Sequence, residues 1–201
     1  PEIVLKYGYR AEEHSITTKD GYILTIHRIP NPQRPVVFLQ HGLFGSSSDW
    51  ILLGPNKGLG IGDDFHEVGV LDLPAMIDYI LGVTEEKSLY YVGHSMGGSV
   101  VFVMGSLLPE YNSKIRIAMA LAPGAFFTKS SNIYFRLTEY SKVGYVSVFV
   151  SSKFHQYHHG RELNLKYYKS QEPPEYNLTA ITMPISIHAG VTDSITTIKV
   201  R

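Results

Sequence analysis

Residues 88–99 read SLYYVGHSMGGS, an apolar run that leads directly into a glycine-rich turn. The apolar run predicts a strand over 88–92, and the spacing of apolar residues over 99–108 predicts a helix. Between them, Gly93-x-Ser95-x-Gly97 has the pattern of a nucleophile elbow, a sharp strand-to-helix turn that exposes a serine hydroxyl. Glycines suit such a turn because its backbone is strained and neighbouring elements approach it closely. Ser95 is therefore the candidate nucleophile for acyl transfer.

The segments on either side of this motif predict an α/β fold with a mostly parallel sheet. A hairpin is expected over 14–27 with its turn at Asp20-Gly21, because aspartate followed by glycine favours a positive-φ turn. A helix is expected from Asp72, with Asp72 as N-cap and Pro74 in its first turn, to Gly82. Further strands are expected over 35–40, 114–121 and 183–189. Alternating strands and helices are typical of a parallel sheet with helices on both faces.

Composition narrows the class of protein. The 201 residues carry 18 basic and 18 acidic side chains, so the net charge is near zero. Nucleic acids and anionic membranes attract proteins with a basic excess, and neither is therefore expected as the main partner. The hydrophobic fraction of 44% is typical of a globular domain. No apolar run approaches the ~20 residues of a membrane-spanning helix. The chain has no cysteine, which excludes disulfides and thiolate metal sites, and nothing in it predicts a metal or a cofactor.

Two backbone N–H groups are candidates for binding the oxyanion. One belongs to Met96, because the residue after the nucleophile opens the helix and its N–H points toward the developing charge. The other belongs to Leu43, in the His41-Gly42-Leu43 turn that follows the strand over 35–40.

A serine nucleophile also needs a base and an orienting carboxylate. Asp193 is the candidate acid, because it follows the last predicted strand in the chain order Ser, Asp, His that is typical of this fold. Only eight residues follow Asp193, and none of them is a histidine. His94 lies beside Ser95, where alternation along the strand directs it away from the nucleophile. The remaining candidates lie in turns, irregular segments or a strand, and none is assigned as the base: His41, His66, His155, His158, His159 and His188.

The chain resembles the acid lipase family of the α/β-hydrolases, the gastric and lysosomal lipases and their insect relatives. The resemblance runs over nearly the whole chain and is carried by motifs at residues 8–9, 12, 18–24, 28–30, 40–43, 66–67, 72–80, 93–98, 120–123, 156–157, 160 and 173–176. It implies hydrolysis of triacylglycerols or sterol esters at a lipid–water interface, without a cofactor, in a secreted or lysosomal protein. His158 stands where an aspartate is common.

The chain also departs from the family pattern, which indicates an incomplete sequence. A block is missing between Gly60 and Ile61, so an interior strand of the sheet is expected to be absent. The stretch after Phe127 is shorter than the cap of the family, and the C-terminal strand with its histidine is missing. We therefore expect the first part of the core over 1–125, a reduced cap over 126–176 and a return to the core over 177–201.

Asn177-Leu178-Thr179 is an N-glycosylation acceptor after a Pro-Pro turn, which favours the secretory pathway. Two other functions stay open beside a lipid ester hydrolase. One is a lipase-like protein that binds lipid without turnover, since the base is missing. The other is a peptidase or different acyl hydrolase on the same fold, because a fold does not fix a function.

Overall fold

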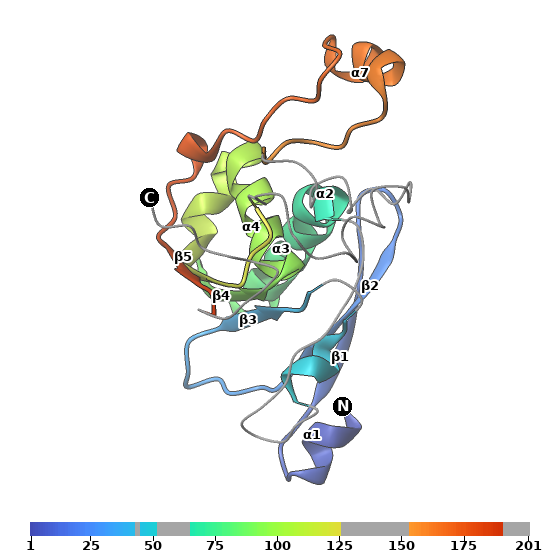
Figure 1. Cartoon of the computed structure of the whole chain (residues 1–201). Coiled ribbons are helices and arrows are strands. Elements are labelled where there is room, and N and C mark those ends of the chain that lie inside the picture. The colour runs from blue at the N-terminus through green and yellow to red at the C-terminus, as the bar shows by residue number, and fades with distance from the viewer. Residues whose placement is uncertain (43–44, 52–64, 126–152, 191–201) are drawn as a thin grey trace.

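A computed structural model describes residues 1–42, 45–51, 65–125 and 153–190 (Figure 1). Its strands are β1 (Glu12–Thr17), β2 (Ile23–Arg28), β3 (Val37–Gln40), β4 (Leu89–His94), β5 (Ile115–Leu121) and β6 (Ile185–His188). Its α-helices are α1 (Glu2–Lys6), α2 (Phe65–Glu67), α3 (Leu73–Thr84), α4 (Met96–Leu107) and α7 (Arg161–Tyr168). Shorter helical turns are η1 (Ser47–Trp50), η2 (Val68–Asp72), η3 (Pro109–Lys114) and η4 (Leu178–Ala180).

The predicted hairpin is confirmed. Strands β1 and β2 pair antiparallel, from Glu12 opposite Arg28 to Thr17 opposite Ile23. The turn closes where the N–H of Thr18 donates to the carbonyl of Tyr22 at 2.8 Å. Gly21 has a φ of +94°, a conformation that an L side chain rarely adopts, so the Asp-Gly pair does set this turn.

The predicted parallel sheet is confirmed, with strands in the order β3-β4-β5-β6. β3 pairs directly with β4, from Val37 opposite Tyr90 to Gln40 opposite Gly93. The absence of an interior strand stays a prediction, because residues 52–64 lie outside the described residues. Among the described residues, β3 stands at the edge of the four-stranded sheet, and the β1–β2 hairpin forms a separate sheet.

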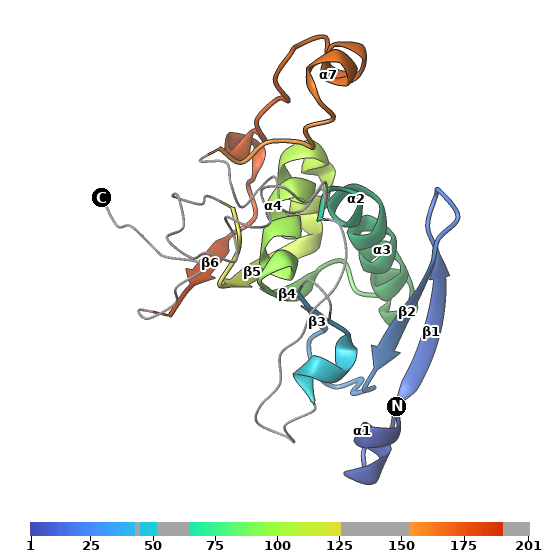
Figure 2. The ribbon, with the colours of Figure 1, turned by 45° about the vertical axis from the view of Figure 1, so that its right-hand side comes forward.

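The two faces of the sheet differ in their cover. Phe38, Tyr91 and Ala118 lie opposite one another on neighbouring strands and are buried beneath the helices. In the adjacent row, Leu39 and Met119 are 42% and 41% exposed on the other face. Figures 1 and 2 both place α3 and α4 on the same side of the sheet. Helices on both faces were expected, but the described part of the chain supplies α-helices to one face alone.

The helix expected from Asp72 begins earlier. Phe65 opens a helical segment, and η2 is a turn of π-helix in which the N–H of Leu73 donates to the carbonyl of Val68. Asp72 therefore has helical dihedrals and makes no capping bond, which corrects its assignment as N-cap. The wide turn lies just before Pro74, whose missing N–H interrupts the regular ladder. The helix continues past Gly82 to Thr84, and the next residue, Glu85, adopts the left-handed conformation.

Helix α4 lies at the centre of the core. Residues 96–106 of this helix are all buried, as expected for a helix covered on every side. The sheet, the α2–α3 segment and Phe154 from the later part of the chain all surround it, and the rings of Phe102 and Phe154 meet edge to face at 6.4 Å. The elbow serine directly precedes this helix, so a buried element fixes its position.

Candidate active site

Ser95 joins β4 to α4 in a strained conformation. Its φ of +51° and ψ of −116° lie in a region that non-glycine residues avoid, at a cost of about 1–3 kcal/mol. Hydrogen bonds hold it there: its N–H donates to the carbonyl of Leu121 at 2.8 Å, and its carbonyl accepts from the N–H of Gly98 at 2.9 Å. The side chain is half-buried, and no described residue forms a hydrogen bond with its hydroxyl. The backbone at Ser95 thus has the sharp strand-to-helix turn that an elbow requires.

The glycines around Ser95 are required by backbone packing. A Cβ atom on Gly93 would lie 2.2 Å from the carbonyl oxygen of Gly97, far inside contact distance. A Cβ atom on Gly97 would lie 2.4 Å from the carbonyl oxygen of Gln40 and 2.6 Å from that of His41. The start of α4 therefore packs directly on the end of β3, where the candidate oxyanion turn begins. Sequence spacing alone did not identify this contact.

Two buried hydroxyl groups tie the elbow to its neighbours. The phenol of Tyr91 donates to the carbonyl of Gly97 at 2.6 Å, inside the first turn of α4. Ser99 is fully buried, and its Oγ accepts from the N–H of Gly124 at 2.9 Å and lies 3.2 Å from the carbonyl oxygen of Ser95. These residues were not singled out from the sequence. The one available signal was that polar side chains interrupt an otherwise apolar strand and helix.

Burial raises the pKa of Tyr91 because an ionised phenolate would lose its hydration. Since the folded state favours the neutral phenol, this contribution to stability is complete at neutral pH and is lost as the pH rises above about 10. We expect Tyr91→Phe to cost about 1 kcal/mol at pH 7 through the lost hydrogen bond. At pH 10.5 and above, this difference from the unmodified protein should shrink or reverse in urea unfolding.

The control for this prediction is Tyr22→Phe, a tyrosine that is 69% exposed on the hairpin turn. It should leave both the neutral and the alkaline unfolding curves nearly unchanged. An equal deficit of Tyr91→Phe at both pH values would contradict the role of the buried phenol.

The structure brings together two of the four predicted catalytic positions. Met96 directly follows Ser95 as the first residue of α4, and its N–H therefore has no partner within the helix. The turn that carries Leu43 begins beside Gly97, but Leu43 itself lies outside the described residues. Asp193 also lies outside them. These two assignments stay predictions.

Three histidines of the described residues have hydrogen-bond partners other than Ser95. His66 Nδ1 lies 2.7 Å from the Tyr176 hydroxyl, and His41 Nδ1 lies 3.0 Å from the carbonyl oxygen of Gly42. His188 Nε2 lies 2.8 Å from Ser186 Oγ. Within the part of the chain that the structure describes, no imidazole is hydrogen-bonded to the elbow hydroxyl. The base is therefore not identified among the described residues, and its identity stays a prediction.

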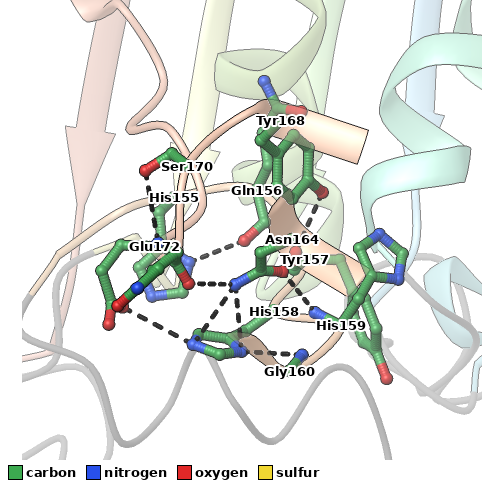
Figure 3. A network of polar contacts seen from close by, with 11 residues as sticks. His155, Gln156, Tyr157, His158, His159, Gly160, Asn164, Tyr168, Ser170 and Glu172 are labelled. Carbon is green, nitrogen blue, oxygen red and sulfur yellow. Dashed lines mark hydrogen bonds and ion pairs between the residues drawn. The ribbon is translucent and has the colours of Figure 1, made fainter. Parts of the chain in front are cut away.

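Residues 153–176 form a projection that carries α7 away from the sheet (Figures 1 and 2). Its base is an antiparallel contact in which the N–H of Tyr176 donates to the carbonyl of Phe154 at 3.0 Å. Its tip is organised around Asn164, which is fully buried and accepts from the N–H of His159 at 2.9 Å (Figure 3). His158 Nδ1 accepts from the N–H of Gly160 at 3.0 Å in the same network. An imidazole thus provides here the local acceptor that a carboxylate provides at the start of many turns.

The predicted glycosylation acceptor is exposed to solvent. Asn177 and Thr179 are both exposed, and the Thr179 hydroxyl donates to Asn177 Oδ1 at 2.6 Å.

Among the described residues, no helix is long and apolar enough to cross a membrane. These residues also contain no group of three or more histidine, aspartate or glutamate side chains arranged to hold a metal ion.

Comparisons with known sequences agree with this geometry. Residues 1–54 match the family model described as a partial alpha/beta-hydrolase lipase region. The chain is 34% identical over 178 residues to gastric triacylglycerol lipase of Bos taurus, which covers 68% of the chain and 45% of that lipase. It is 28% identical to Lipase 1 of Drosophila melanogaster over an alignment of 293 residues, which covers 96% of the chain and 67% of that lipase. Because this alignment is longer than the chain, Lipase 1 carries segments that have no counterpart here. Lipase 1 apart, the chain spans about half or less of the curated relatives it matches.

Solved structures show the same fold. The esterase Pf2001 of Pyrococcus furiosus superimposes with a TM-score of 0.60 at 15% identity, over 98% of this chain and 77% of the esterase. The esterase RhEst1 of a Rhodococcus species superimposes with a TM-score of 0.56 at 10% identity, over 92% and 82% of the two chains. At such low identity the similarity concerns the fold alone, which is that of an α/β-hydrolase.

Proposed function

We propose that this chain, which belongs to the acid lipase family of the α/β-hydrolases, supplies the nucleophile of a serine hydrolase that cleaves carboxylic esters of lipids. The observation that carries the proposal is Ser95, a half-buried serine at a φ of +51° between the interior strand β4 and the buried helix α4. Maintaining such strain is costly, and strained residues concentrate at functional sites.

The proposed reaction uses the elbow as follows. Ser95 Oγ attacks the acyl carbonyl carbon while its proton passes to a base, and the leaving alcohol then takes that proton. The backbone N–H groups of Met96 and Leu43 bind the oxyanion of the tetrahedral intermediate. Asp193 orients the base, which we propose is a histidine outside these 201 residues. Water then cleaves the acyl-enzyme by the same steps in reverse order.

The substrate class and the compartment belong to this proposal as well. The name of gastric triacylglycerol lipase, a relative at 34% identity, supports a triacylglycerol or a similar lipid ester as substrate. The exposed Asn177 sequon supports glycosylation and a secreted or lysosomal protein. Aromatic residues within 126–176 favour a cap over the acyl-binding site.

The test is covalent labelling of the mature protein with a fluorophosphonate, followed by intact mass measurement and peptide mapping. We expect the label on Ser95, and a loss of at least ~100-fold in the labelling of the tryptic peptide 88–114 in Ser95→Ala. The matched control is Ser113→Ala, which removes an exposed serine on η3 and should leave labelling unchanged. A mass well above 22.5 kDa plus one glycan would account for the missing base.

Unmodified protein that carries no label on the tryptic peptide 88–114 would contradict the proposal. Retention of lipid by the protein without labelling or turnover of a p-nitrophenyl ester would instead support the lipid-binding alternative.

A further inference from the structure

Three side chains from three elements form a nucleophile–base–acid array far along the chain from Ser95. Ser47 Oγ on η1 lies 2.5 Å from His27 Nδ1 on β2. On the other side of the ring, His27 Nε2 lies 3.1 Å from Glu13 Oε2 on β1. A nucleophile within hydrogen-bonding distance of a base, which a third group orients, is the arrangement that activates a serine.

The local structure explains why these side chains meet. Glu13 and His27 lie directly opposite each other in the β1–β2 ladder, so their side chains share one face of the hairpin. Ser47 is the first residue of η1, which begins at a capping box formed by Ser46 and Asp49. The cap fixes the start of η1 and thereby presents Ser47 to the imidazole.

The two contacts of the ring fit one neutral tautomer. In that tautomer Nε2 carries the hydrogen and donates it to Glu13, which can only accept. Nδ1 then accepts the hydroxyl hydrogen of Ser47. The neighbouring acid Glu12 is engaged separately, by Arg28 at 3.1 Å and His14 at 3.3 Å, and does not compete for His27. The array is therefore set to remove the proton of Ser47.

We propose that Ser47 is a second nucleophilic serine, activated by His27 and Glu13, that accepts acyl groups from small activated esters. Ser47 Oγ bonds to the acyl carbon, its proton moves to His27 Nδ1, and the carbon–oxygen bond to the leaving group breaks. The leaving group takes the proton from His27, and water later hydrolyses the acyl-serine through the same base. Ser47 and His27 are the catalytic residues here, and Glu13 is a positioning residue.

The surroundings favour esters with a good leaving group, such as small aryl esters. The His27 and Glu13 side chains are 32% and 58% exposed, so an ester reaches the array from solvent. Two nearby backbone N–H groups are already used within η1, since those of Ser48 and Asp49 both bond to Ser46. With little stabilisation of the oxyanion, the reaction depends on a good leaving group such as a nitrophenolate.

The experiment uses Ser95→Ala, in which the elbow nucleophile is absent, treated with p-nitrophenyl acetate and separately with a fluorophosphonate. We expect modification of Ser47, which Lys57 and Lys87 separate from position 95 in a tryptic map. In the double variant Ser95→Ala with Ser47→Ala, the rate at which the reagent modifies the protein should fall about 100-fold, the low end of general-base effects. Adding Ser48→Ala instead, as the matched control one residue along η1, should leave the rate unchanged.

Two further variants separate chemistry from mere packing. His27→Ala should lower the rate to that of Ser47→Ala, and free imidazole should restore part of it. Glu13→Gln should lower the rate about tenfold while the protein stays folded by circular dichroism. If Ser47 stays unmodified in a folded Ser95→Ala protein, the array only fastens η1 to the hairpin and the proposal is wrong. This outcome is independent of labelling at Ser95 in the unmodified protein, which tests the proposed lipid esterase.

Discussion

Replacing Gly93 by alanine is expected to cost about 3 kcal/mol or more of unfolding free energy, a large part of the ~5–15 kcal/mol that is typical of a folded domain. The added methyl group would lie 2.2 Å from the carbonyl oxygen and 2.4 Å from the carbonyl carbon of Gly97, and 2.7 Å from the amide nitrogen of Gly98. All three are backbone atoms at the start of a buried helix, so none can turn aside as a flexible side chain would. Urea unfolding followed by circular dichroism measures the effect.

The matched control is Gly82→Ala. Gly82 lies inside α3, and a Cβ atom placed on it meets nothing within 4 Å. Since alanine favours a helix by up to ~1 kcal/mol over glycine, this variant should be as stable as the unmodified protein or more stable. Similar unfolding curves for the two alanine variants would mean that β4 and α4 are not packed as described.

Replacing Asn112 by alanine is expected to cost about 3–5 kcal/mol, the range reached when a buried hydrogen-bond network is broken. Asn112 is buried, and its Nδ2 donates to the carbonyl groups of Gly105 and Pro109 at 3.0 and 2.9 Å. Its Oδ1 accepts from the N–H groups of Thr182 and Met183 at 3.0 and 3.2 Å. Alanine leaves these backbone groups without partners at the junction of α4, η3 and the segment that leads into β6.

Asn112→Asp tests which half of the amide matters. Aspartate keeps the shape and the acceptor for residues 182–183 but removes both N–H donors, so we expect a loss comparable to that of alanine. Ser113→Ala, at the exposed neighbouring position, should change unfolding by less than ~0.5 kcal/mol. A small effect of Asn112→Ala would show that solvent reaches these backbone groups.

The hydrogen-bond partners of Asn112 could not be predicted from the sequence. An asparagine between two predicted elements has the appearance of an ordinary loop residue, because such residues favour turns. Its partners at residues 180–183 come from almost 70 residues further along the chain, so no local pattern reveals them. The same holds for Ser99, which bonds to Gly124, and for the meeting of Glu13, His27 and Ser47.

Helical boundaries were predicted less well than strands. Each strand has a short apolar or alternating run that defines it, and the six strands in the described residues agree with the predicted segments. The helix over 65–84 contains Pro74 and Gly82, which are typical end signals, yet burial of Val68, Leu73 and Ile77 keeps the segment helical through both. Packing therefore overrode local preference at those positions.

By itself, the sequence determined the hairpin, the strand–elbow–helix order and the position of the candidate nucleophile, because each depends on neighbouring residues and on the conformations they allow. Only the tertiary structure decided the order of strands in the sheet, the single face that helices cover, the backbone contacts that require Gly93 and Gly97, and the partners of Ser95. Those features depend on contacts between residues distant in the chain, which the folding of the core selects and no short stretch of residues encodes.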